Sequence, residues 1–280
     1  MSAPDPPREH VTPYDRFAWS DTQIEEWLAA GAHGTELGTY FGAVEYRQLA
    51  ALARRAQQRP PAADALRVLI VPGIMGSQLG LKRAAPLPDD IVWLDPIDIQ
   101  QGRLAALRIG SPARIVPLGA VLYSYLPLKL YLRARGFAAE LFDYDWRLSV
   151  GELAGVLAER LRAARGTRLA IVAHSMGGLV ARAALAHSGT AHVERLVLLG
   201  TPNCGSFAAV QAVRGTYAVV RRLAQLAVRA SAEELAAEVF NTFPSLYDLL
   251  PTGACDRRGR LLERGTWPQS GPRPHAALLE

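Results

Sequence analysis

One stretch constrains the fold of this chain more than any other. The apolar run of residues 168–173 leads directly into His174-Ser175-Met176-Gly177, and a helical pattern over residues 176–186 follows at once. So sharp a turn strains the central residue and requires small residues two positions before and after it, because the two backbones nearly touch. Ala173 and Gly177 meet this requirement. The pattern predicts a nucleophile elbow, with Ser175 at the carboxyl end of a sheet.

Three further runs have the apolar continuity of strands buried on both faces of a parallel sheet: residues 66–71, 138–142 and 195–199. Helical patterns over residues 121–135 and 149–164 alternate with them, the second opened by a capping box of Ser149 and Glu152. This alternation predicts an α/β fold, a doubly wound, mostly parallel sheet like that of α/β-hydrolases. We assign residues 63–206 to this core.

The segments outside the core are predicted from their periodicity. Residues 1–62 form an N-terminal helical extension. Ser20 and Gln23 open its first helix, Gly31 ends it, and a second helix covers residues 37–58. Its expected inner face holds Phe41, Val44, Leu49, Leu52 and Ala53. Residues 207–251, apolar every three or four positions, predict a helical cap or lid, and residues 252–280 an irregular C-terminal tail.

Composition narrows the classes of protein. No run approaches the roughly 20 apolar residues that span a bilayer. Two cysteines, Cys204 and Cys255, exclude a disulfide scaffold and a four-thiolate metal site, although one bridge stays open. We expect no metal and no cofactor. The N-terminus lacks the pattern of a secretory signal, which predicts cytoplasmic localisation.

The charge of the chain bears on its partners. The formal net charge is +5, and only Lys82 and Lys129 among the 31 basic residues are lysine. The arginines are scattered and not interleaved with aromatic residues, so we expect no nucleic-acid partner. Peripheral contact with an anionic membrane fits the same charge.

The loop of residues 72–76 follows the first strand, where hydrolases of this fold place an oxyanion donor. Gly73 and Gly76 let the backbone pass close to a substrate, and the N–H groups of Ile74 and Met176 are the expected donors. The alternative is a phosphate-binding loop, but this stretch has neither the G-K-[S/T] ending nor the G-x-G-x-x-G spacing of such loops. His174 is adjacent to the serine and is expected to be structural.

Six motifs then occur in order along the chain. They are Pro72-Gly73-Ile74-Met75-Gly76-Ser77-Gln78-Leu79, Val92-Trp93-Leu94-Asp95-Pro96, Tyr144-Asp145-Trp146-Arg147, Ala173-His174-Ser175-Met176-Gly177-Gly178, Gly200-Thr201-Pro202-Asn203-Cys204-Gly205-Ser206, and Phe243-Pro244-Ser245 with Leu249-Leu250-Pro251. Over about residues 66–251 the chain resembles the lecithin:cholesterol acyltransferase family and its phospholipase and transacylase relatives.

The resemblance implies roles for matching residues. Ser175 matches the acyl-accepting nucleophile, the N–H groups of Ile74 and Met176 match the oxyanion hole, and Trp93 matches a lid tryptophan that touches lipid. The cysteines that flank this lid in secreted members are absent here. Asp143, Asp145 and Arg147 are expected to form a structural ion pair, and Asp248 to pack or cap.

A serine nucleophile needs a base and an orienting acid, which follow it here in the order acid, then histidine. His187 and His192 lie just after the elbow helix, at the far end of the sheet. Asp256 and His275 have the right order, but residues 252–280 show no strand pattern. Either the chain is a truncated form without its last two strands, which we favour, or Asp256 and His275 form an unusual triad.

The sequence therefore predicts a serine-dependent lipid ester hydrolase or O-acyltransferase that works through an acyl-enzyme on Ser175. The alternative is a non-catalytic protein of the same fold that binds lipid or a protein partner.

Overall fold

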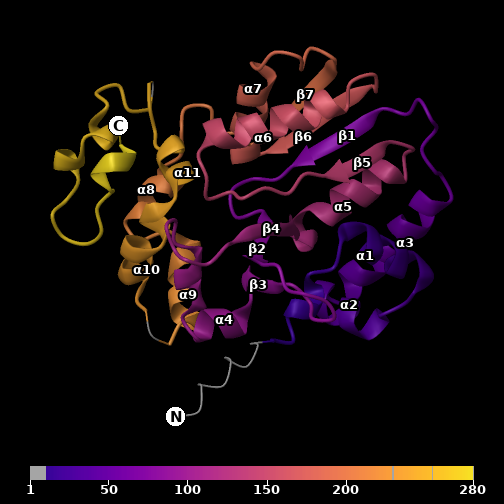
Figure 1. The fold of residues 1–280 in the computed structure, drawn as a ribbon, viewed down its shortest axis with the longest axis horizontal. Helices are drawn as coiled ribbons and strands as arrows, with labels where there is room; N and C mark the ends of the chain where they lie inside the picture. Colours follow the sequence, from indigo (N-terminus) through magenta and orange to yellow (C-terminus); the bar gives the residue numbers. More distant parts are fainter. Residues whose placement is uncertain (1–10, 229, 254, 280) are drawn as a thin grey trace, which may run out of the picture.

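A computed structural model describes residues 11–228, 230–253 and 255–279. A four-stranded sheet lies at its centre, with helices on both faces (Figure 1). The strand order is β5-β1-β6-β7, and every pair is parallel. The strands are β1 (Arg67–Val71), β5 (Ala138–Leu141), β6 (Leu169–His174) and β7 (Val193–Leu199). All four were predicted, and the α/β class with a mostly parallel sheet is confirmed.

The two faces of the sheet pack against different helices. One face contributes Leu69, Val71, Ile171 and Ala173 to the main core, together with α6 (Val150–Ala163) and α7 (Met176–Leu185). The other face contributes Val68, Ile70 and Ala139 to a smaller cluster with Tyr125 of α5 (Leu122–Arg133). Alternate residues of a strand point to opposite faces, so burial on both sides explains the continuous apolar runs.

β7 differs from the expected burial. Val197, Leu198 and Leu199 are 46%, 37% and 41% exposed. The reason is the place of β7 at the edge of the sheet, because among the described residues it pairs with β6 alone.

The N-terminal helices pack against α5. They are α1 (Asp21–Ala30), α2 (Gly34–Phe41) and α3 (Ala43–Gln57), preceded by the 3-10 helix η1 (Asp15–Phe17). Ser20 accepts a hydrogen bond from the Gln23 N–H and Gly31 ends α1 with φ 73°, as predicted. The single helix predicted over residues 37–58 is wrong. Gly42, with φ 89°, breaks it into α2 and α3 and leaves Val44 52% exposed.

A second, antiparallel sheet was not predicted. It has the order β3-β2-β4, with β2 (Ser77–Leu81), β3 (Asp90–Trp93) and β4 (Val116–Ala120), and α4 (Pro96–Gln100) and η2 (Arg103–Leu107) follow β3. Gly80 and Pro117 interrupt the short strands, which obscures their apolar alternation. β2 begins directly after the loop of residues 72–76, so this sheet anchors that loop.

Short helices form the predicted cap region, beside α4 in Figure 1. They are α8 (Phe207–Val213), α9 (Ala218–Leu226), α10 (Ala232–Glu238), η3 (Phe240–Thr242) and α11 (Pro244–Asp248). The described part of residues 252–279 holds three 3-10 helices and no strand, as the sequence indicated: η4 (Arg260–Leu262), η5 (Arg264–Thr266) and η6 (Ala276–Leu278).

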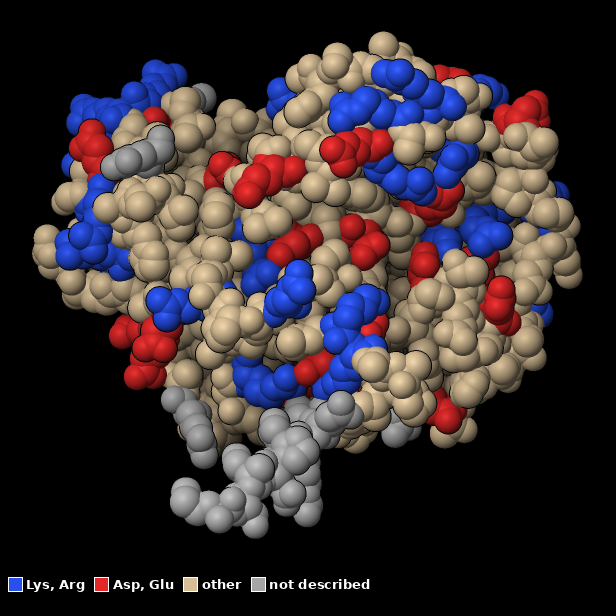
Figure 2. All heavy atoms as spheres, viewed as in Figure 1, with Lys and Arg blue, Asp and Glu red and all other residues tan. Residues whose placement is uncertain are grey.

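The distribution of charge, the character of the helices and the placement of possible metal ligands can be compared with the classes of protein considered above. Figure 2 shows basic and acidic side chains interspersed over one face of the molecule. None of the described helices combines the length and the apolar character needed to cross a bilayer. Within the described ranges, no three histidine, cysteine or carboxylate side chains converge in a way that would hold a metal ion.

Candidate active site

Ser175 stands at the junction of β6 and α7 in a strained conformation. Its φ is 53° and its ψ is −127°, a region that non-glycine residues rarely adopt. Its N–H donates to the carbonyl of Leu199 at 2.8 Å, and its carbonyl accepts from the N–H of Gly178 at 3.0 Å. The chain passes from strand to helix within this one residue, which is the geometry of a nucleophile elbow.

Ser175 borders a cavity of about 150 Å³. The cavity lies between the loops that follow β1 and β7 and the helices α8 and α11. Apart from Ser175, Ser206, Tyr217 and Gly200, its lining is apolar, and no charged side chain belongs to it. The apolar residues are Ile74, Met75, Pro202, Ala208, Ala209, Ala212, Leu246 and Leu249. Such a lining suits a hydrocarbon group beside the serine.

The loop of residues 72–76 forms a tight turn at the same cavity. The Gly76 N–H donates to the Gly73 carbonyl at 3.1 Å, and Met75 has a positive φ of 62°. In the part of the chain that the structure describes, the N–H groups of Ile74 and Met176 have no hydrogen-bond acceptor. Met176 is the first residue of α7, where helix geometry leaves N–H groups open and favours negative charge. Neither expected oxyanion donor is therefore engaged within the described residues; Ile74 borders the cavity, and Met176 is buried directly after Ser175.

Two buried side chains hydrogen-bond to backbone carbonyls of this loop. The Tyr144 hydroxyl donates to the Pro72 carbonyl at 2.5 Å, and burial raises the pKa of this phenol, so it remains a donor. The indole Nε1–H of Trp93 donates to the Met75 carbonyl at 3.2 Å. Trp93 is only 1% exposed and packs edge-on against Trp146. This place differs from the expected lipid contact, because the indole lies under the loop and does not line the cavity.

The predicted ion pair is confirmed for two of its three residues. The guanidinium of Arg147 contacts Asp145 twice, with Nε–Oδ1 2.8 Å and Nη2–Oδ2 2.6 Å. Its Nη1 donates to the carbonyl of Leu107. Asp143 lies outside this pair, and burial raises the pKa of its carboxyl. The pair thus braces the loop after β5 and is structural.

The predicted capping role of Asp248 is also confirmed. Its Oδ2 accepts the Val150 N–H at 2.6 Å, at the start of α6. Ser206 likewise caps a helix, since its Oγ accepts the Ala208 N–H at 3.2 Å. The side chains of Asp248 and Ser206 therefore accept hydrogen bonds from N–H groups at the starts of helices, which is a structural role.

The structure does not gather the candidate base and acid around Ser175. Asp256 accepts the Leu261 N–H at 2.8 Å, which closes a turn. The side chain of His275 is exposed, and its backbone N–H donates to the Tyr247 hydroxyl. No hydrogen bond between described residues joins Ser175, Asp256 and His275, and neither candidate borders the cavity. His187 and His192 follow the distant end of α7, as expected.

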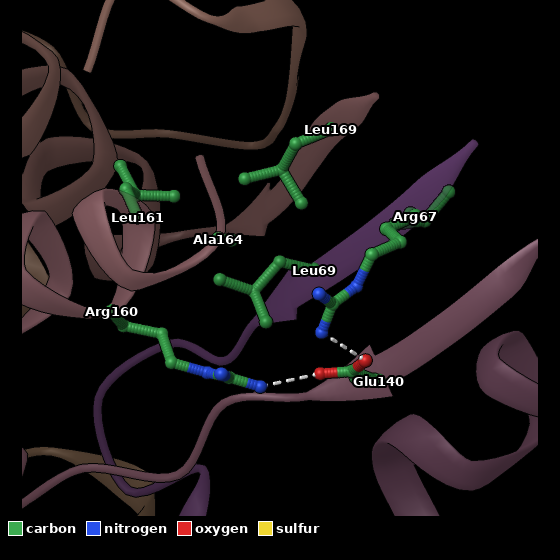
Figure 3. Close-up of a pocket in the computed structure, with 8 residues that line it drawn as sticks. Arg67, Leu69, Glu140, Arg160, Leu161, Ala164 and Leu169 are labelled. Atoms are coloured by element: carbon green, nitrogen blue, oxygen red, sulfur yellow. Dashed lines mark hydrogen bonds and ion pairs between the residues drawn. The ribbon is translucent and has the colours of Figure 1, made fainter. Parts of the chain in front are cut away.

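A second hollow lies at the opposite end of the sheet (Figure 3). Arg67 and Leu169 begin β1 and β6 there, and Glu140 pairs with both Arg67 and Arg160 at 2.6 Å. Its volume of about 10 Å³ admits about one water molecule. This hollow is therefore too small for a substrate.

Comparisons with known proteins agree with the motifs. The family model described as lecithin:cholesterol acyltransferase matches residues 132–268, which confirms the resemblance over that range. No curated protein matches the sequence.

Solved structures with a similar arrangement include two forms of one lipase and one complex. The mature form of the Bacillus licheniformis lipase BlEst2 is 20% identical, with 68% of this chain and 56% of that chain covered and a TM-score of 0.36. The Tle4–Tli4 complex is 16% identical, with 72% of this chain and 56% of that chain covered and a TM-score of 0.39. The propeptide form of BlEst2 is 19% identical, with 67% of this chain and 33% of that chain covered and a TM-score of 0.33. The chain spans about half the length of the first two.

Proposed function

We propose that the protein is a serine-dependent lipid ester hydrolase or O-acyltransferase that forms an acyl-enzyme on Ser175. The observation that carries the proposal is that Ser175 and Ile74 border one apolar cavity, and that the N–H groups of Ile74 and of Met176, the residue after Ser175, are unpaired among the described residues. The match of residues 132–268 to the lecithin:cholesterol acyltransferase model supports a lipid ester as substrate.

The proposed reaction has two steps. In the first, Ser175 Oγ loses its proton to a base and attacks the ester carbonyl, and the carbonyl oxygen gains negative charge. The N–H groups of Ile74 and Met176 stabilise this charge, and loss of one such donor typically slows acyl transfer by about 10²–10³. The ester C–O bond then breaks, and the base returns the proton to the leaving alcohol, so that Ser175 keeps the acyl group. Water or a second alcohol then takes the acyl group from Ser175. No metal or cofactor takes part.

Labelling with a fluorophosphonate tests the nucleophile. We expect the protein to take up one phosphonyl group, located on Ser175 by peptide mass spectrometry, and Ser175→Ala to take up none. Ser206→Ala is the matched control, because Ser206 borders the same cavity but its Oγ caps α8. Labelling of Ser175→Ala at the wild-type rate would contradict the proposal. Vesicle binding without labelling, unchanged in Ser175→Ala, would support the non-catalytic alternative.

The same probe tests Asp256 and His275 as acid and base. Asp256 is engaged by Leu261, and His275 is exposed away from the cavity lining. We therefore expect Asp256→Asn and His275→Gln to label within about twofold of wild type. A loss of a hundredfold or more in both variants would instead establish them as the acid and base, since removing such a group costs about 10²–10⁴.

We also propose cytoplasmic localisation and peripheral contact with membranes. Cys204 and Cys255 are free and exposed, as suits a reducing compartment.

Phe207, at the start of α8 beside the cavity, is 60% exposed. We expect Phe207→Ser to lower binding to anionic phosphatidylglycerol vesicles severalfold, with Tyr131→Ser, an exposed aromatic of α5, as the control. Vesicle binding unaffected by Phe207→Ser would remove this face from consideration.

A further inference from the structure

Tyr125 of α5 connects the loop of residues 72–76 to the elbow strand. Its hydroxyl oxygen accepts the N–H of Gly73 at 2.9 Å. The same oxygen lies 2.9 Å from Nδ1 of His174, the residue before Ser175. Tyr125 is 7% exposed and belongs neither to the cavity lining nor to the reacting groups. One buried phenol thus contacts both backbone segments that carry the oxyanion donors.

The space around this contact is tight. A Cβ on Gly73 would lie 2.9 Å from Ser175 Cβ and 3.1 Å from His174 Nδ1. A Cβ on Gly76 would lie 2.9 Å from the Tyr125 hydroxyl. The phenol hydroxyl therefore lies close to Gly76 and hydrogen-bonds to Gly73, and Gly73 itself approaches Ser175 and His174 directly. A shift of this hydroxyl would move Ile74, which lies between those glycines.

The directions of the hydrogen bonds follow from the donors available. The Gly73 amide can only donate, so the phenol oxygen accepts from it; the phenol O–H donates to Nδ1 of His174 when the imidazole carries its proton on Nε2, and the oxygen accepts from Nδ1–H in the other tautomer. Burial raises the pKa of Tyr125, so the phenol keeps its proton at neutral pH. The chain of contacts runs from Gly73 through Tyr125 to His174.

We propose that Tyr125 and His174 are positioning residues of the oxyanion hole, which hold the Ile74 N–H in register with the Met176 N–H. This inference rests on the proposed function. Neither residue touches the substrate. His174 anchors the phenol, the phenol anchors Gly73, and the next residue presents the donor. Misplacement of a catalytic group by about 1 Å can cost 10²-fold in rate.

The test compares Tyr125→Phe with Tyr123→Phe. Tyr123 lies on the same helix and is 60% exposed, so its variant controls for a tyrosine-to-phenylalanine change in α5. For Tyr125→Phe we expect the fluorophosphonate labelling rate and kcat on p-nitrophenyl butyrate to fall about 10- to 100-fold, with KM within twofold of wild type. We expect faster hydrogen exchange at the Gly73 amide. Tyr123→Phe should change none of these values.

Two substitutions of His174 separate positioning from general structural damage. Asn carries Oδ1 near the place of Nδ1 and can accept the phenol O–H, whereas Leu cannot. We expect His174→Asn to label within about threefold of wild type and His174→Leu to lose as much as Tyr125→Phe. Thermal unfolding of each variant reports whether it folds.

The outcomes distinguish the two proposals. A wild-type protein that is not labelled would overturn the proposed function and this inference with it. A labelled wild type with an unchanged Tyr125→Phe would overturn the inference alone. Equal losses in His174→Asn and His174→Leu would overturn the role given to His174.

Discussion

Gly177 lies so close to the Pro72 carbonyl oxygen that a Cβ at position 177 would overlap this oxygen. The same Cβ would lie 2.7 Å from the carbonyl oxygen of Val71. Both atoms are backbone, and the Tyr144 hydroxyl holds the Pro72 carbonyl at 2.5 Å. The first turn of α7 and the start of the loop after β1 therefore meet at their backbones, which brings the loop that carries Ile74 next to the helix that begins at Met176.

Gly177→Ala is expected to destabilise the protein by about 1–3 kcal/mol, because overpacking against fixed atoms forces the backbone apart. The matched control is Gly155→Ala in α6, where a Cβ meets nothing within 4 Å. That change should stabilise the protein by about 0.5–1 kcal/mol through helix propensity. Urea denaturation measures both. A Gly177→Ala protein as stable as wild type would contradict the close approach.

Ser175→Gly is expected to be more stable than Ser175→Ala by about 1 kcal/mol, because glycine adopts the conformation at φ 53° and ψ −127° without strain. Neither variant should label with a fluorophosphonate. At Ser124, inside α5, the order should reverse, with alanine better than glycine by about 1 kcal/mol. Thermal unfolding of the four variants checks this, and the same order at both sites would refute strain at the elbow.

Ala212→Phe is expected to shorten the acyl chain that the enzyme accepts. Ala212 is 2% exposed and lines the cavity of about 150 Å³. A phenyl ring there fills much of this volume, so turnover of p-nitrophenyl palmitate should fall about tenfold or more relative to the acetate. Gln211→Phe, on an exposed neighbouring position, should keep the wild-type profile. An unchanged chain-length profile in Ala212→Phe would argue against this cavity as the acyl site.

Asp143→Asn is expected to stabilise the protein at neutral pH. Burial raises the pKa of this carboxyl, so the folded state binds its proton more tightly than the unfolded state, whose pKa is about 3.9. Stability therefore falls as pH rises from about 4 through the folded pKa. The variant should raise Tm at pH 7 and match wild type at pH 3.

Asp145→Asn is the matched control for that experiment. It removes the partner of the buried Arg147, so it should lower stability at pH 7 by about 3–5 kcal/mol. A Tm that falls in both variants at pH 7 would show that Asp143 stabilises the fold in its charged form.

The long patterns of the sequence predicted most of the central fold. The four parallel strands have apolar runs, α6 has a capping box, and the apolar residues of α5 and α7 recur at helical spacing, so local pattern sufficed. Two errors share one cause, which is glycine or proline inside an element. Gly42 splits the second helix, and Gly80 and Pro117 obscure strands of the small sheet. That sheet is held by pairing between distant segments, which no local pattern records.

The candidate site divides in the same way. The elbow followed from spacing, because Ala173 and Gly177 are the small residues that a strand-to-helix turn at Ser175 requires. The surroundings of the serine depend on which distant elements pack together. Trp93 lies under the loop, since its N–H finds a carbonyl there, and Tyr125 reaches the elbow from α5. Asp256 and His275 have a suitable order along the chain, but in the fold Asp256 contacts Leu261 and the His275 backbone contacts Tyr247. The local pattern of small residues therefore identifies the nucleophile, whereas long-range packing, which includes the approach of Gly177 to Pro72, selects the groups that hold and surround it.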